Sequence, residues 1–273
     1  MECITCGGGA ITERPDLTAR GYRRFRCRDC GKQFNERSAD LLNRAQYPSD
    51  VIALVVFFRL RYKLSLRDLA EMFLLRGIEF SHETVRQWEV LLTPTLISTL
   101  RHRRGGGSRV GRSWYTDETY IKVAGRWHYL YRAIDRAGNL VDVLLSEKRD
   151  MAAAIAFFRS AKAVTGVVPS RVTTDGHDSY PRAIRTTLGK NVRHRTSRYL
   201  NNRIEQDHRG IKSRYDPMRG FGSASSAARF CVCHEELRNH LRLNRHRRTS
   251  PASAHRRHFI RRSRSALNVL IAA

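Results

Sequence analysis

Apolar residues between positions 49 and 92 recur at the spacing of amphipathic helices. They predict one helix that begins at Ser49, a second that begins at Ser65 and ends near Gly77, and a third that opens within residues 81–84. The inward-facing positions of these helices are Val51, Ile52, Leu54, Val55, Phe58, Leu66, Leu69, Ala70, Phe73, Val85, Trp88 and Leu92.

The pattern changes to strands after about residue 112. Residues 120–123 and 127–134 predict a hairpin that turns at Gly125, and residues 139–146 predict a third strand. Three antiparallel strands followed by alternating helix and strand indicate a mixed α/β sheet, and the pattern fits an RNase H-like domain. The later elements are expected as a helix over 151–164, a strand over 172–174, a helix over 180–188 and a helix beginning near 202.

Charge narrows the class of partner. The 273 residues include 51 Lys and Arg against 25 Asp and Glu, a formal net charge of +26, while 41% of the residues are hydrophobic. A folded chain with this excess of cations favours a polyanion such as double-stranded DNA, because neutralised phosphates release counterions. Apolar runs such as 51–58 are too short for a bilayer, which needs about 20 residues, so we expect no membrane partner.

Four of the six cysteines form two Cys-x-x-Cys pairs, Cys3 with Cys6 and Cys27 with Cys30. Two such turns can complete a tetrahedral sulfur site for one structural Zn²⁺, so residues 1–40 are predicted to be a zinc ribbon. The alternative is four unligated thiols. Metal-type cysteine spacing is also typical of a reducing compartment, and we expect a cytoplasmic protein.

The two later predicted helices, joined by a turn with Gly77, are typical of a helix-turn-helix within residues 45–100. Ser81 and Thr84 both qualify as the cap of its last helix. The alternative is an ordinary three-helix packing unit. Residues expected to contact DNA are Arg23, Arg24 and Arg26 in the ribbon and His82, Thr84, Arg86 and Gln87 in this unit.

Composition shifts mark the remaining boundaries. A basic cluster followed by three glycines predicts a flexible linker over 101–111. The α/β domain is expected to span 112–241. Between Arg242 and Arg264 there are nine arginines and no acidic residue, so 242–273 is predicted to be a flexible basic tail that follows the DNA backbone.

Three acidic residues occupy informative places in the α/β domain. Asp117 lies in a strand, Asp175 ends a short strand before Gly176, and Glu205 lies near the start of a helix. Clustered carboxylates can hold two Mg²⁺ ions about 4 Å apart, the arrangement that phosphodiester chemistry uses. Lys212 follows Glu205 by seven residues, so both lie on nearly the same helix face, where the lysine would suit a DNA phosphate.

Other residues compete for these roles. Asp178 could replace Asp175 as a ligand, although its place in the following turn disfavours it. Asp207 should point away from Glu205 on the helix, and His208 is expected to be an exposed polar residue. Two further expectations concern packing: Asp135 and Asp142 in turns or at strand edges, and Cys231 and Cys233 as packing thiols in a helix.

Three segments resemble bacterial DDE transposases of the insertion-sequence-six family. They are Asp117-Glu118-Thr119-Tyr120-Ile121-Lys122-Val123 with Tyr131-Arg132-Ala133-Ile134-Asp135, then Thr174-Asp175-Gly176, and Tyr199-Leu200-Asn201-Asn202-Arg203-Ile204-Glu205-Gln206-Asp207-His208 with Arg219-Gly220-Phe221. The resemblance implies that Asp117, Asp175 and Glu205 are the catalytic triad and Lys212 the basic residue after it. The ribbon is an addition to the shortest relatives, and the interval from Asp175 to Glu205 is a few residues short.

The residues and the resemblance together predict the transposase of an insertion sequence. It would bind terminal inverted repeats, nick the 3′ ends with Mg²⁺ and join them to target DNA on an RNase H-like core, as a homodimer or larger assembly. Two alternatives are a DNA-binding regulator whose triad is inactive and an RNase H-like nuclease that does not join ends.

Overall fold

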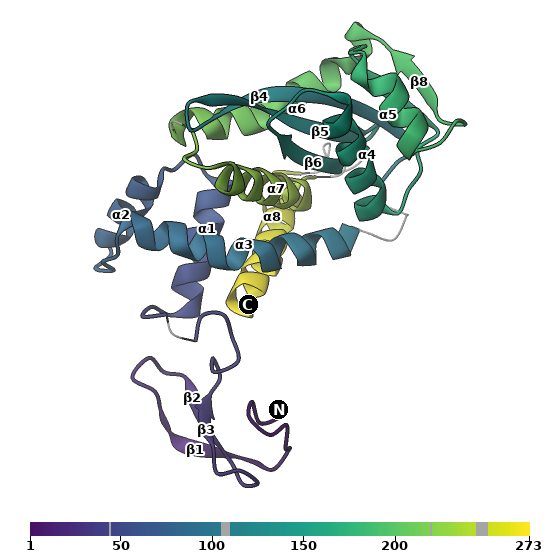
Figure 1. Ribbon diagram of the computed structural model, residues 1–273. Coiled ribbons are helices and arrows are strands. Elements are labelled where there is room, and N and C mark those ends of the chain that lie inside the picture. The colour runs from purple at the N-terminus through teal and green to yellow at the C-terminus, as the bar shows by residue number, and fades with distance from the viewer. Residues whose placement is uncertain (44, 105–109, 219, 244–250) are drawn as a thin grey trace.

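The computed structural model describes residues 1–43, 45–104, 110–218, 220–243 and 251–273. Three regions follow one another along the chain: a small N-terminal sheet, a helical region and an α/β region (Figure 1). The last helix returns from the α/β region to the helical one, as Figure 1 shows in yellow. No described helix has the length and apolar character needed to cross a membrane.

The N-terminal sheet contains β1 (Ile11–Leu17), β2 (Arg23–Cys27) and β3 (Gln33–Asn35), paired antiparallel in that order. Its core is small. Phe25 and Phe34 pack with ring centroids 5.7 Å apart beside the buried Cys3 and Cys27. So small an apolar core contributes little to folding, and two of its four buried residues are cysteines of the four-cysteine cluster.

The helical region confirms the three expected helices as α1 (Ser49–Arg61), α2 (Leu66–Leu74) and α3 (His82–Arg104). Ser65 and Asp68 form a capping box at the start of α2. Of the two candidate caps of α3, Ser81 is the cap, because its hydroxyl accepts from the Thr84 backbone N–H at 3.2 Å. Buried apolar residues of all three helices share one core.

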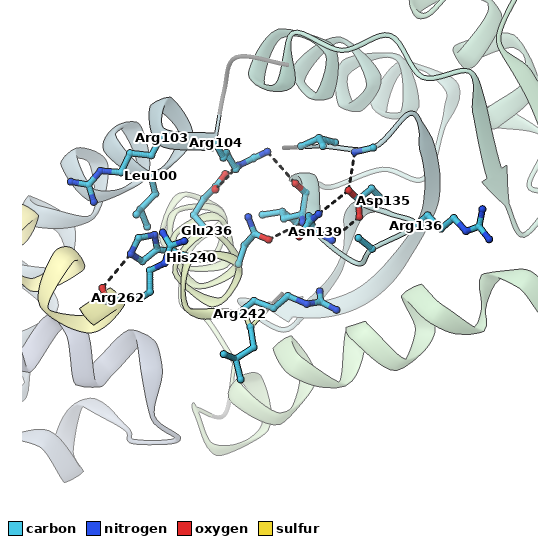
Figure 2. A pocket seen from close by; sticks show the side chains of 16 residues that line it. Leu100, Arg103, Arg104, Asp135, Arg136, Asn139, Glu236, His240, Arg242 and Arg262 are labelled. Atoms are coloured by element: carbon cyan, nitrogen blue, oxygen red, sulfur yellow. Dashed lines mark hydrogen bonds and ion pairs between the residues drawn. The ribbon is translucent and has the colours of Figure 1, made fainter. Parts of the chain in front are cut away.

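The expected linker is wrong at its start, because α3 continues through residues 101–104. Arg104 is buried and donates to both carboxylate oxygens of Glu236, at 2.8 and 2.7 Å, and Arg101 donates to Glu236 and to Asp142. Figure 2 shows this end of α3 at a pocket of about 790 Å³ that Arg136, Arg242 and Arg262 also line. The three consecutive glycines of the predicted linker, at 105–107, lie outside the described residues.

The α/β region contains a five-stranded mixed sheet. Strands β4 (Ser113–Val123), β5 (Arg126–Asp135) and β6 (Leu140–Ser146) form an antiparallel meander, and β7 (Arg171–Thr174) and β8 (Arg193–Thr196) run parallel to β4. The strand order β6-β5-β4-β7-β8 is that of an RNase H-like fold, as expected. Of the five strands of this sheet, β8 alone was not predicted. Its four residues are polar, two exposed and two half-buried, and they show no apolar alternation.

Helices cover both faces of this sheet. On one face α4 (Met151–Thr165) and α5 (Ser179–Thr187) pack through Phe157 and Tyr180 onto Trp114 and Tyr131. On the other face lie α6 (Arg198–Tyr215), the short η1 (Asp216–Met218) and α7 (Ala224–Leu241). Alternating side chains of β4 therefore enter two different environments.

The expected flexible tail is wrong over its ordered part, since α8 (Ala252–Ile271) is a helix packed against α1 and α3. Ala266 and Leu270 are fully buried in the core of the helical region. The Leu41 N–H also donates to the Ala273 carbonyl at 2.8 Å. The many arginines led to the prediction of a solvated arm. Apolar residues at helical spacing after position 258, however, form one face of α8, and this face packs against the helical region. Residues 244–250 lie outside the described residues.

Candidate active site

Asp117 and Asp175 lie 175 − 117 = 58 residues apart in the sequence and meet at the carboxyl end of β7. The parallel ladder between β4 and β7 ends at the pair Tyr115 and Thr173. Asp117 comes two residues after Tyr115, and Asp175 comes two residues after Thr173. One carboxylate oxygen of Asp117 lies within 4.8 Å of one of Asp175. The sheet therefore brings the two predicted aspartates together.

The turn after Asp175 is held tightly. Gly176 has a φ of +102°, and a Cβ there would lie 2.6 Å from the Thr196 side chain of β8. The Asp175 carboxylate accepts from the His177 backbone N–H at 3.1 Å. A side chain at position 176 would thus press on Thr196 and displace β8, and its positive φ also favours glycine.

Glu118 lies with the two aspartates, and the sequence analysis did not predict a role for this glutamate. Asp117 and Glu118 are neighbours on β4, and neighbouring strand residues face opposite sides of a sheet. Because β4 has no β7 partner beyond Tyr115, the carboxylates of both residues can still reach the end of β7. A Glu118 oxygen lies within 4.8 Å of one from Asp117 and one from Asp175. The only signal in the sequence was its position beside Asp117.

The electrostatics of this cluster suit a divalent cation. Burial raises the pKa of Asp117 to about 7, and the negative charges of Glu118, Asp175 and Glu205 add to the effect. Carboxylate oxygens are the ligands that Mg²⁺ prefers, and a bound cation would remove the repulsion among them. The donor set and its charge thus fit magnesium.

Glu205 approaches from the opposite side, on α6. The preceding Ile204 is fully buried against Tyr115 and Ile134, which fixes this turn of α6 on the sheet. Glu205 itself is exposed, and its charge acts on Asp117. It is not among the described carboxylates whose oxygens lie within 4.8 Å of one another. Lys212 is exposed further along the same helix.

His208 corrects one expectation, because it is buried rather than exposed. Its Nδ1 lies 3.9 Å from an Asp117 carboxylate oxygen. Burial and the nearby Arg132 lower the pKa of His208 to about 3, so the ring is neutral near pH 7. It therefore packs beside Asp117 without supplying a competing positive charge.

A buried charge network holds α6 in place. Arg132 on β5 is completely buried and donates to Asp207 at 2.5 Å and to Glu235 on α7 at 2.6 Å. Arg238 donates to the same two carboxylates. Asp207 thus points inward to Arg132 and Arg238 while Glu205 is exposed, so the two side chains diverge on the helix as expected. The network ties α6, which carries Glu205, to β5 and α7.

The remaining rivals have structural roles. Asp178 is exposed beside the first turn of α5 and lies outside the described carboxylate group. Asp135 accepts from the Asn139 N–H in the turn after β5, which confirms its expected place. Asp142 was expected in a turn or at a strand edge, but it is buried within β6 and paired with Arg101. Cys231 and Cys233 are buried packing thiols on α7, as expected.

The four N-terminal cysteines form the second candidate metal site. Their sulfurs all lie within 4.8 Å of one another, with Cys3 to Cys30 and Cys6 to Cys27 both at 3.6 Å. Backbone N–H groups of Cys6 and Thr5 favour the Cys3 thiolate and lower its pKa to about 6. Four sulfurs around one point, with backbone donors supporting the thiolate form, fit a tetrahedral Zn²⁺.

The residues expected to contact DNA lie on exposed or half-exposed surface, although several have internal partners. In the ribbon, Arg23 pairs with Glu36 at 2.7 Å and Arg24 with Asp16 at 2.6 Å, while Arg26 is exposed on the same strand. At the start of α3, Glu83 forms an ion pair with Arg86 at 3.2 Å, and the Nε2 of His82 lies 3.3 Å from its carboxylate. Of the other two residues expected to contact DNA, Thr84 is half-buried beside the capping residue Ser81, and Gln87 is exposed.

Comparison with known proteins decides the family. Residues 111–244 match the family described as DDE domain. The chain is 37% identical over 192 residues to the Staphylococcus aureus transposase for insertion sequence-like element IS431mec, covering 69% of this chain and 84% of that protein. The chain belongs to the insertion-sequence-six family of DDE transposases. The S. aureus transposase for insertion sequence element IS257 in transposon Tn4003 shows the same identity and coverage.

Likeness among solved structures is weaker than these sequence matches. A chain of the simian T-cell lymphotropic virus intasome has 18% identity and a TM-score of 0.40, covering 55% of this transposase and 58% of that chain. The HTLV-2 integrase catalytic core domain in complex with magnesium has 20% identity and a TM-score of 0.33, covering 39% and 71%. The family assignment rests on the sequence relatives.

Proposed function

We propose that this transposase nicks the 3′ ends of its insertion sequence and joins them to target DNA at the cluster of Asp117, Glu118 and Asp175, with Glu205 completing the site from α6. The convergence of Asp117 and Asp175 at the end of β7, within 4.8 Å and next to Glu118, is the observation that carries the proposal. The alternatives of a regulator and of a nuclease have no separate observation in their favour.

Each residue has a distinct part in the proposed reaction. Two magnesium ions bound at the cluster would activate the attacking oxygen and stabilise the leaving oxygen of the phosphodiester. Asp117 and Asp175 hold their carboxylates at the edge of the sheet, and Glu205 faces them from α6. Neutral His208 packs beside Asp117 and excludes water from its buried side. Lys212, on the exposed face of α6, contacts a DNA phosphate.

We also propose how DNA reaches this site. The zinc-bound ribbon and the unit over 45–100 hold the element's terminal repeats, the first through Arg23, Arg24 and Arg26, and the second through the start of α3. Exposed arginines of α8 extend the basic surface along the backbone of double-stranded DNA. Because two element ends must be joined in one reaction, the active form is a homodimer or a larger assembly.

Strand transfer with a precut end tests the proposal. A duplex that ends in a free 3′-hydroxyl and supercoiled target DNA are incubated with the full-length transposase and Mg²⁺, and joined products are counted. We expect Asp117→Asn, Asp175→Asn and Glu205→Gln each to reduce joining by at least about a hundredfold, since removing one stabilising group typically costs 10²–10³. The matched control Asp178→Asn removes an acid three residues from Asp175 and should keep joining near the wild-type level.

The outcomes separate the three functions. Cleavage without any joined product would identify a nuclease. DNA binding without cleavage or joining by the wild type and all three triad variants would identify a DNA-binding regulator. Joining that all three variants retain at the wild-type level would reject the triad as the catalytic site.

A further inference from the structure

Arg149 bridges two carboxylates of the active-site cluster. Its Nε donates to Glu118, and its Nη2 donates to Asp175 at 3.3 Å. The backbone at this arginine is anchored, because the next residue, Asp150, caps α4 by accepting from the Ala153 N–H at 2.8 Å. A guanidinium therefore lies where it can neutralise Asp175 in the absence of a metal ion.

Glu118 keeps that guanidinium in place. Its side chain is only 2% exposed, and its second oxygen accepts from the buried Tyr180 hydroxyl. A buried carboxylate requires a counter-charge and hydrogen-bond donors, and Arg149 and Tyr180 supply them. The contact to Asp175 is longer and lies at a more exposed carboxylate, 35% against 2%. Arg149 can therefore release Asp175 while it stays bound to Glu118.

We propose that Arg149 is a resident counter-charge that competes with the divalent cation for Asp175. This inference rests on the proposed function, since it takes Asp117 and Asp175 as metal ligands. A carboxylate oxygen that accepts from the guanidinium is partly neutralised, and a positive charge a few ångströms from a divalent ion opposes its binding. Arg149 thus weakens metal binding in the DNA-free protein, and Glu118, by holding and neutralising Arg149, limits that weakening.

Mn²⁺ binding to the full-length, DNA-free protein tests this, by titration calorimetry and by electron paramagnetic resonance of the free ion. Removing the charge in Arg149→Gln should tighten binding about tenfold, whereas Arg149→Lys, which retains the charge, should stay within about threefold of wild type. The control Arg159→Gln removes the same charge from the exposed face of α4 and should leave the affinity unchanged. Unchanged or weaker binding in Arg149→Gln would overturn the inference.

Glu118 variants distinguish a tether from a direct metal ligand. Glu118→Gln should weaken Mn²⁺ binding, because Arg149 then faces Asp175 with its full charge. The double variant Glu118→Gln/Arg149→Gln should return near wild-type affinity. A double variant as weak as Glu118→Gln would make Glu118 a ligand and remove the role of Arg149. The double variant also leaves no unpaired charge against Tyr180, so it serves if Arg149→Gln does not fold.

The same titration separates failure of this inference from failure of the proposed site. Wild-type Mn²⁺ binding that persists in Asp117→Asn and Asp175→Asn would reject the metal site itself. Binding that depends on both aspartates but is indifferent to Arg149 would reject the counter-charge alone.

Discussion

Asp207→Asn tests whether the buried network on α6 holds Glu205, the proposed catalytic glutamate, in place. Asp207 is 8% exposed and accepts from Arg132 at 2.5 Å and from Arg238 at 2.5 Å. The substitution keeps the size of the side chain but removes the charge that both arginines require. Among the residues that the structure describes, Arg132 then keeps Glu235 alone as an ionic partner. We expect a loss of stability together with a displacement of the α6 turn that carries Glu205.

The magnitude follows from the pKa of Asp207. Although burial opposes ionisation, Arg132 and Arg238 outweigh it and lower this pKa from 3.8 to about 2. At 1.36 kcal/mol per pH unit, the carboxylate contributes about 2.5 kcal/mol to the free energy of unfolding. Because the folded pKa is depressed, this contribution is fully present above about pH 4 and is lost as the pH falls toward 2. At pH 7 the variant should therefore be less stable by about 2.5 kcal/mol.

Urea unfolding of the full-length protein at pH 7 and at pH 3, followed by tryptophan fluorescence, to which the buried Trp88 and Trp114 contribute, measures the effect. Asp216→Asn, which removes an exposed acid in η1, is the matched control and should change the unfolding free energy by less than about 0.5 kcal/mol. A penalty for Asp207→Asn that is the same at both pH values would refute the linkage argument. Full stability with full strand-transfer activity would refute the positioning role of the network.

Three further predictions concern the other parts of the chain. Cys27→Ser should reduce the metal content from about one zinc per chain to almost none by mass spectrometry, whereas Cys231→Ala, in the packed interior of α7, should retain the zinc. Leu270→Ala should lower the free energy of unfolding by about 2–5 kcal/mol, because Leu270 is fully buried, while the exposed Ile271→Ala should have little effect; equal losses would contradict the docking of α8. Arg86→Ala should weaken binding to terminal-repeat DNA by fluorescence anisotropy and reduce the salt slope by about one, in contrast to Arg185→Ala on α5; identical binding curves would remove α3 from the interface.

Local spacing was enough to predict the cluster of four cysteines and most of the secondary structure. The interval between Cys3 and Cys6 and the matching interval at Cys27 reflect the geometry of one tight turn around a metal, which covalent structure alone determines. Likewise the three helices after Ser49 and the hairpin at Gly125 depend on periodicity and caps within a few residues. These features need no knowledge of the rest of the fold.

Tertiary structure alone decided where the charges go. His208 was expected to be exposed, and nothing near Asp142 or Asp207 in the sequence predicted a charged partner, yet all three residues are buried. Arginines from distant strands and helices neutralise the two acids, and α6 packs the histidine beside Asp117 of the sheet. The bridge from Glu118 through Arg149 to Asp175 joins three segments that only the sheet and the start of α4 bring together. The sequence by itself determined the cysteine cluster, because local spacing sets each Cys-x-x-Cys turn, and it marked the candidate carboxylates by their places on predicted strands and a helix. The meeting of those carboxylates and the surroundings of each depend on contacts between residues far apart in the chain, which only the folded structure supplies.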